Sequence, residues 1–289
     1  IQYMFICCLL FVVPAKAYSQ SRLILNGAKI NISKGASLVI NNSASNAITR
    51  YNGFIISEGE NNKIKWCIGN ATGSYIVPLG YQSEYIPVSF TKAAGTGNGY
   101  FVFSSYHTAW NNSAFLPTGV SNVNYAGIDN SSFIIDRFWQ IDASNYSIKP
   151  ALSNLTFSYI DQEYTATGNS IVESELGVQR WNPTISDWND FIPGVTVNVL
   201  TNKATVTTVN AGDLYKWWIL PAMNGSQALP VELVEFKGEC DNGNVVLQWT
   251  TASEFNSHYF DVERSTDGDN WNVIATKFSN GNSSVVKKY

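Results

Sequence analysis

Short stretches in which apolar and polar residues alternate recur through most of this 289-residue chain. Ile64, Trp66 and Ile68, for example, are separated by Lys65 and Cys67. This period of two is typical of strands with one buried face. Turn residues separate such stretches about every 8 to 12 residues, a spacing typical of a sandwich of short strands. The pattern predicts an all-β fold, and the only helical hint is one turn within residues 171–176.

The composition agrees with a fold of this kind. Only 14% of the residues are charged, whereas 45% are hydrophobic. Asn, Gly, Ser and Thr keep such a chain soluble, and they suit turns better than long helices. The formal net charge of −4 and the pI near 5.2 argue against a nucleic-acid surface, which needs clustered Lys and Arg.

Residues 1–20 read IQYMFICCLLFVVPAKAYSQ and predict a secretory signal peptide. The apolar run over residues 4–13 has the length of a signal-peptide core and is too short to span a bilayer. Small residues follow at Ala15, Ala17 and Ser19, which predicts cleavage before Gln20, with a competing site after Ala17. Basic residues are missing ahead of the run, so we expect a clipped N-terminus. We therefore interpret residues 1–19 as a signal peptide and expect a secreted or outer-surface protein with no transmembrane segment after cleavage.

Cysteine usage indicates no metal site. Cys7 and Cys8 lie inside the predicted signal, and cleavage leaves Cys67 and Cys240 in different predicted domains. Spacing alone leaves a disulfide between these two open, and two thiols fit neither a disulfide framework nor a four-ligand zinc site. Neither a GxGxxG nor a Walker pattern occurs, so we also expect no cofactor.

The turn signals divide the mature chain into four parts. In residues 20–58, alternating residues flank Asn26-Gly27, which predicts a hairpin; the short rungs also resemble the opening turns of a β-solenoid. We interpret them as strands leading into a β-sandwich at residues 59–222, in which residues 195–199 and 204–209 form a hairpin. A linker at residues 223–228 and a module at residues 229–289 follow.

Two charged residues interrupt the most apolar predicted strand, which covers residues 133–141. Asp136 and Arg137 are neighbours in this strand and therefore face opposite sides of the sheet. Because a buried charge needs a partner, we expect one of them to meet an opposite charge across the sheet. We interpret the pair as part of the architecture.

The C-terminal module resembles a known fold. Its phrases "LPVELVEF", "VVLQWTTASE" and "YFDVERSTDG" predict strands that place Trp249 in a core, on the same face as Val245 and Leu247. Their order resembles the first half of a fibronectin type III-like, or Ig-like, sandwich. The phrases also resemble the module near the C-terminus of many type IX secretion substrates of Gram-negative bacteria. About four of the roughly seven strands of such a sandwich are present. The chain is thus predicted to be a fragment whose inner apolar residues, such as Trp271 and Val273, lack part of their cover.

The resemblance extends into the main domain. The phrases "DRFWQID", "LTFSYID", "QRWNPTISDWNDF" and "YKWWIL" are similar to a β-sandwich region common in large exported proteins of the same bacteria. These motifs are structural and carry no catalytic residues. The resemblance implies an exported protein built of several β-sandwich modules.

Aromatic residues late in the main domain are the best candidates for ligand binding. Trp181, Trp188, Tyr215 and Trp217 could stack on sugar rings, as aromatic residues do in carbohydrate-binding sandwiches. Trp217 and Trp218 point to opposite faces of one strand, so at least one of them is a core residue. Packing in the core is the competing interpretation for the whole set.

No catalytic residue is predicted. The two histidines, His107 and His258, fit no catalytic arrangement by spacing. Carboxylates at residues 161–175 could form the acid pair of a glycosidase or bind calcium, but a solvated acidic loop is the favoured interpretation, because no general acid is visibly placed in a pocket. Asp267 to Asn270 predict a turn without a metal.

Three functions remain open from the sequence. The first is a non-enzymatic, secreted or cell-surface structural or adhesion protein, whose partner is an extracellular glycan or a surface protein. The second is a carbohydrate-binding module of a polysaccharide-processing exoprotein. The third is an enzyme whose catalytic part lies beyond Tyr289.

Overall fold

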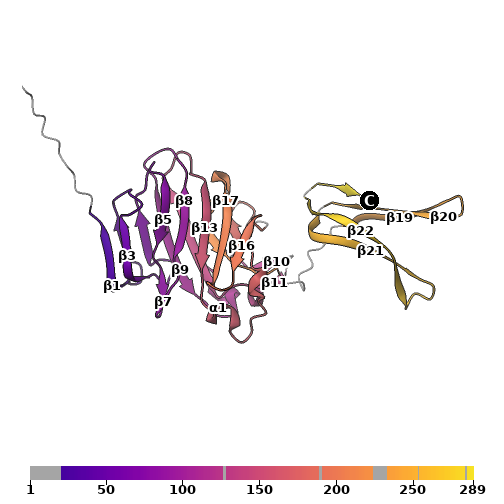
Figure 1. Ribbon diagram of the computed structural model, residues 1–289, viewed down its shortest axis with the longest axis horizontal. Helices are drawn as coiled ribbons and strands as arrows, with labels where there is room; N and C mark the ends of the chain where they lie inside the picture. Colours follow the sequence, from indigo (N-terminus) through magenta and orange to yellow (C-terminus); the bar gives the residue numbers. More distant parts are fainter. Residues whose placement is uncertain (1–20, 126–127, 189–190, 224–232, 253, 284) are drawn as a thin grey trace, which may run out of the picture.

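The computed structural model describes residues 21–125, 128–188, 191–223, 233–252, 254–283 and 285–289, and within them the fold is all-β (Figure 1). The predicted sandwich is confirmed: residues 21–223 form two main sheets, and residues 233–289 form further strands. The signal segment and most of the predicted linker lie outside the described residues. No helix in the described part of the chain is long and apolar enough to cross a membrane.

The N-terminal strands stack in parallel. Strand β1 (Leu23–Asn31) pairs with β3 (Ile48–Ile56), and β2 (Ser37–Ile40) pairs with β4 (Lys63–Trp66). The prediction of a hairpin at Asn26-Gly27 is wrong, because β1 runs straight through these residues. Gly27, at a φ of 80°, lies where the register with β3 shifts, so its positive φ serves a strand irregularity and not a turn.

The larger sheet has seven strands in the order β15–β14–β18–β12–β9–β4–β2. Its remaining members are β9 (Tyr100–His107), β12 (Arg137–Ser144), β14 (Gln179–Asn182), β15 (Asp187–Trp188) and β18 (Trp217–Ile219). The smaller sheet has the order β16–β17–β13–β8–β5. It contains β5 (Gly73–Val77), β8 (Val88–Lys92), β13 (Leu152–Ser158), β16 (Val195–Asn198) and β17 (Lys203–Val209), and the predicted β16–β17 hairpin is confirmed.

Short elements connect these strands. They are β6 (Gly80–Tyr81), β7 (Glu84–Tyr85), β10 (Asn124–Tyr125), β11 (Ile128–Asp129) and α1 (Gln162–Thr165), with 3₁₀ turns η1 (Asn112–Phe115), η2 (Ser131–Phe133), η3 (Glu173–Glu175) and η4 (Ala211–Asp213). The helical hint at residues 171–176 corresponds to η3.

One apolar core fills the space between the two sheets. Its largest buried side chains include Trp66, Phe90, Trp139 and Trp218. Leu25 from β1 belongs to the same core. The strands before residue 59 are therefore packed as part of the sandwich and share its core.

A second, smaller core lies on the outer face of the seven-stranded sheet. The segment of residues 108–134, called here the covering segment, contributes Val120, Val123 and Ile134 to this core. The sheet contributes Phe138 and Ile219 together with three tryptophans. This outer face is thus partly covered by the protein's own chain.

The outer face of the five-stranded sheet is different. One line of paired residues crosses all five strands and reads Ile76, Ser89, Thr156, Thr205 and Thr196. The Thr156 and Thr205 hydroxyls lie 2.9 Å apart. We call this surface the hydroxyl face.

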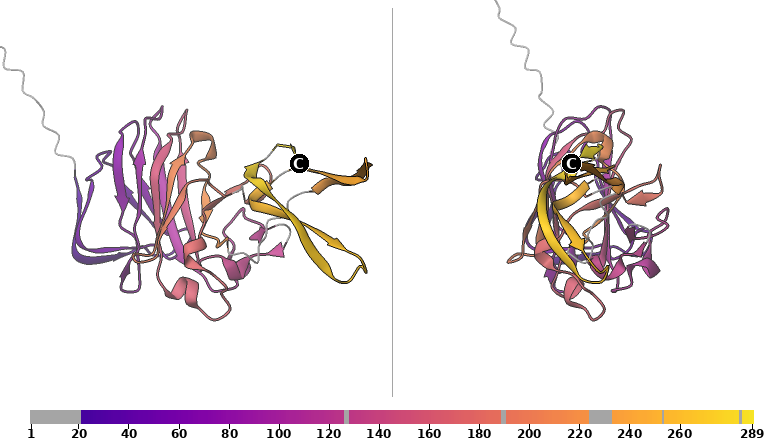
Figure 2. Two further views of the ribbon diagram at one scale, coloured as in Figure 1. Left: turned by 45° about the vertical axis from the view of Figure 1, so that its right-hand side comes forward. Right: turned by 90° about the vertical axis from the view of Figure 1, so that its right-hand side faces the viewer.

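The C-terminal strands form two small sheets. Strands β19 (Leu233–Asp241), β20 (Asn244–Thr251) and β23 (Lys287–Lys288) make one, and β21 (Glu254–Ser265) and β22 (Trp271–Ser283) make the other. Figure 2 shows β21 and β22 as a long hairpin.

A small aromatic cluster joins these strands. Trp249 is buried against Phe236, Phe260 and Tyr289, as the sequence predicted for a core residue. Val245 at the far end of the same strand is 64% exposed. Trp271 and Val273 are more than half exposed.

Candidate functional site

The four aromatic residues predicted to bind a ligand are largely packing residues in the structure. Trp181, Trp188 and Trp217 are buried in the second core, and Tyr215 is half-buried. Trp218 faces the main core, so the predicted opposite orientation of Trp217 and Trp218 is confirmed and both are core residues. In this conformation the three buried rings cannot offer a face to a sugar.

A buried group of charges forms the most unusual site in the sandwich. Arg137 begins β12, and its side chain is fully buried. Its Nε donates to Glu163 Oε1 at 2.6 Å, and its Nη1 donates to Glu58 Oε1 at 2.8 Å and to Ser105 Oγ at 2.9 Å. Together with His107, these residues make what we call the ionic cluster. The expected partner for a charge in this strand is thus confirmed, and two acids provide it.

The ionic cluster ties distant parts of the chain to one end of the sandwich. Glu163 lies in α1, is fully buried, and also accepts the main-chain N–H of Ile160. Glu58 follows β3 at a φ of 39°, a left-handed conformation that is uncommon for a residue with a side chain. Because removing one partner of a buried ion pair leaves an uncompensated charge, the cluster holds α1 and the end of β3 against β12.

His107, at the end of β9, is oriented by this cluster. Its Nδ1 lies 3.3 Å from Glu163 Oε1, and its main-chain N–H donates to Glu58 Oε2 at 2.8 Å. The Tyr81 ring stacks on the imidazole, with centroids 4.8 Å apart, and also lies near the Arg137 guanidinium. The imidazole is therefore fixed between a carboxylate and an aromatic ring.

Asp136 points to the other side of the sheet, beneath the covering segment. It is 1% exposed, and burial raises its pKa to about 6. Asn169 Nδ2 donates to Asp136 Oδ2 at 3.1 Å and opposes this rise. Asp136 Oδ1 and Asn169 Oδ1 are both buried without a hydrogen-bond partner.

The carboxylates considered as a glycosidase pair bond to neighbouring side chains, and Asp161 and Glu173 share Tyr164 as a neighbour. Glu163 belongs to the ionic cluster, whereas Glu173 accepts the Tyr159 hydroxyl at 2.8 Å and Asp161 accepts Asn202 Nδ2 at 2.6 Å. Glu175 is exposed. These partners describe local structure at the α1 end of the sandwich, in agreement with the structural alternative.

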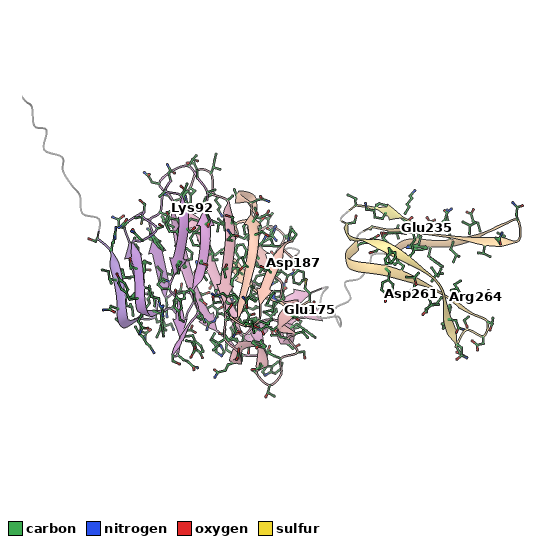
Figure 3. The ribbon with its side chains drawn as sticks, in the orientation of Figure 1. Lys92, Glu175, Asp187, Glu235, Asp261 and Arg264 are labelled. Atoms are coloured by element: carbon green, nitrogen blue, oxygen red, sulfur yellow. The ribbon has the colours of Figure 1, made fainter. Side chains whose placement is uncertain are left out.

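A second buried cation lies at the opposite end of the sandwich from α1. Lys92, labelled in Figure 3, is 1% exposed, and its Nζ donates to the carbonyls of Ala71 and Ala93 at 2.8 and 3.1 Å. Burial lowers its pKa. These contacts fix the loop after β4 to the end of β8.

The remaining candidates have local roles or lie outside the described side chains. The Asp267 carboxylate accepts the side-chain amide of Asn270 and the main-chain N–H groups of Asn270 and Asp269, so the predicted turn is confirmed, and these bonds hold its pKa well below the usual range. Cys67 and Cys240 are free thiols. The side chain of His258 is not among those described. Within the described residues, no group of three or more His, Cys, Asp or Glu could hold a metal ion.

No protein-family model, curated protein or solved structure matches the chain. The site is therefore interpreted from its own geometry. The sequence flagged Asp136, Arg137, Glu163 and His107 separately, but Glu58 was missed. Its only signal is a Glu beside Gly59 at the end of a strand, which is also typical of an ordinary turn.

Proposed function

We propose that this chain is a non-enzymatic structural or adhesion protein, exported to the medium or the outer surface of a Gram-negative bacterium. The observation that carries the proposal is the ionic cluster. The side chains of Arg137 and Glu163 are both fully buried and bonded to each other. They join separate segments of one rigid sandwich and present no reactive group to solvent. The packed tryptophans of the two cores support the same interpretation.

The proposed export rests on the sequence. The signal-like N-terminus and the resemblance to type IX secretion substrates support it, and the C-terminal strands are compatible with a partial fibronectin type III-like module. The test is expression of the full chain in a Gram-negative host with a type IX system, followed by intact-mass analysis of surface and medium fractions. The expected mature protein begins at Gln20 or Tyr18. Retention in the cell with residues 1–17 attached would contradict export.

A second function, carbohydrate binding, is favoured by the hydroxyl face. Ser89, Thr156, Thr205 and Thr196 are neighbours across four strands and carry no charge. Strands lie about 4.7–4.9 Å apart, so the hydroxyls form a regular row that could bond to a neutral polysaccharide. No buried tryptophan is needed for this contact.

A glycan array probed with the full chain tests this second function. Thr205→Lys places a charge in the centre of the row, and Thr184→Lys places the same charge on the exposed turn between β14 and β15. Carbohydrate binding through the hydroxyl face predicts that Thr205→Lys weakens a positive signal at least tenfold and that Thr184→Lys leaves it unchanged. An array without signal would contradict carbohydrate binding, and the structural or adhesion function would then be the one proposal that remains.

A further inference from the structure

The charges at the α1 end of the sandwich do not balance. Glu58 and Glu163 lie against the single guanidinium of Arg137, whereas a third carboxylate, Asp136, points to the other side of the sheet. Asp136 Oδ2 accepts the Asn169 amide and the Asn112 side chain also lowers the Asp136 pKa, but no described cation forms a salt bridge with this carboxylate. Asp136 is buried, and a buried carboxylate without a cationic partner is costly.

Three buried oxygen acceptors on the Asp136 side of the sheet have no hydrogen-bond partner, and Arg137 Nη2 on the other side is a buried donor without one. Asp136 Oδ1 and Asn169 Oδ1, called here the oxygen pair, have no hydrogen-bond partner although both are buried. Asn130, which is 3% exposed, carries a third such atom, Oδ1. Native proteins rarely leave such atoms unsatisfied, and each requires a partner.

These oxygens belong to one small region. The main-chain N–H of Ser170, next to Asn169, donates to Ser132 O at 2.7 Å and ties this loop to the covering segment just after Asn130. Asn112 Nδ2 donates to Ser131 O and Ile134 O, between Asn130 and Asp136. The segments that carry the three oxygens are thus bonded to one another.

An aromatic residue packs against the loop just before Asn169. Gly168 adopts a φ of 105°, and a Cβ there would lie 2.6 Å from the Trp110 ring. The glycine lets the loop before Asn169 run directly beneath Trp110.

We propose that the oxygen pair, with Asn130 Oδ1 nearby, is a binding site for one hard cation, for which Ca²⁺ is the best fit. Carboxylate and amide oxygens are preferred ligands of Ca²⁺, which accepts irregular geometry, whereas Mg²⁺ demands a near-ideal octahedron. Water molecules and main-chain carbonyls complete the coordination. The cation supplies the positive charge that the Asp136 side of the sheet lacks and fixes the α1 loop to the covering segment.

The site is independent of the proposed function, since a structural, adhesive or sugar-binding sandwich could each contain it. Its competitor is a proton, which would also neutralise Asp136. His107 and Glu163 are the titratable groups that act on Asp136 from β9 and α1, and Asn112 and Asn169 are its polar neighbours. The experiment must therefore separate metal from proton.

Thermal unfolding of the full chain, in chelator and in saturating CaCl₂, tests the proposal. Ligand in about hundredfold excess over Kd raises the melting temperature of a domain of this size by about 5 °C. The same gain is expected for Glu175→Gln, which neutralises an exposed carboxylate on η3. Asp136→Asn keeps the shape of the side chain but removes its charge, and it should lose the gain.

Calorimetric titration of the folded protein with CaCl₂ gives a second readout, which does not depend on how well a variant folds. We expect about one Ca²⁺ ion to bind per chain, and no binding to Asp136→Asn. No calcium effect on the unmodified chain, or a gain that persists in Asp136→Asn, overturns the proposal. A stability that depends only on pH would identify the proton as the partner of Asp136.

Discussion

The sandwich and the C-terminal strands are made of similar sequences but bury them very differently. Trp66, Trp139 and Trp218 in the sandwich are fully buried, whereas Trp271 and Phe278 in the C-terminal strands are 58% and 79% exposed. Both parts show alternating strands rich in aromatic residues. The difference lies in the opposing layer: sheets of seven and five strands face each other in one part, and the other has sheets of three and two. Alternation thus specifies a strand, but burial depends on the partner sheet.

The largest effect should come from breaking the ionic cluster. Arg137→Met leaves Glu163 buried without a cation, which we expect to lower the free energy of unfolding by about 3–5 kcal/mol. Urea unfolding followed by circular dichroism measures this loss. The matched change Arg264→Met, at an exposed position of β21, should cost less than about 0.5 kcal/mol. Equal losses would show that the cluster contributes little to the difference between the two parts.

Within the C-terminal strands, a buried tryptophan can be compared with an exposed one. Trp249→Ala removes the centre of the one aromatic cluster described there, and we expect a loss of about 3 kcal/mol in that part. Trp271→Ala, on the exposed surface of β22, should cost less than about 1 kcal/mol. Hydrogen exchange of the amides of β20 in the full chain reports both changes. Similar protection in the two variants would mean that Trp249 is not a core residue.

A loss of stability as pH rises from about 4 to about 6 should come from the sandwich, through Asp136. Asp136 has a folded pKa of about 6, above its ordinary value, so the folded state binds this proton more tightly. In chelator, we therefore expect stability to fall by about 2 kcal/mol as pH rises from about 4 to about 6. Asp136→Asn should flatten this part of the profile. A wild-type profile that rises over the same interval would contradict the burial of an unpaired Asp136.

The smallest effect on folding concerns the exposed apolar residues. Phe278→Ser should change the free energy of unfolding by less than about 0.5 kcal/mol, because the side chain has little cover to lose. Self-association should decrease, since exposed apolar surface promotes it. Light scattering of the full chain checks this point. A large loss of stability would show that Phe278 is covered in solution.

Most of the strand pattern could be predicted from the sequence, because alternation and turn residues are local signals. The β16–β17 hairpin follows from Asn202-Lys203 between two alternating runs. The parallel stacking of β1 on β3 could not be derived in this way. Asn26-Gly27 carries the strongest local signal for a hairpin, yet the partner of β1 lies about 25 residues away, and no local rule specifies it.

In the candidate site too, local sequence signals did not specify partners that are distant in sequence. An opposite charge for Asp136 or Arg137 was predicted from the cost of a buried charge, but its source was not. Glu58 is separated from Arg137 by 79 residues, and only the three-dimensional fold brings them together. The burial of Trp181 and Trp188 could not be derived from the sequence for a related reason, since the covering segment that packs on them is distant in sequence.

The order of strands in the larger sheet also affects how fast the protein can fold. Strand β12 lies between β9 and β18, and Trp139 pairs with Trp218 near the end of the sandwich sequence. Folds that depend on contacts of this kind form slowly, because long loops must close before their contacts stabilise them. During synthesis, β12 cannot complete its pairing until β18 has been made. The nascent chain therefore stays incompletely folded until nearly the whole sandwich has been made.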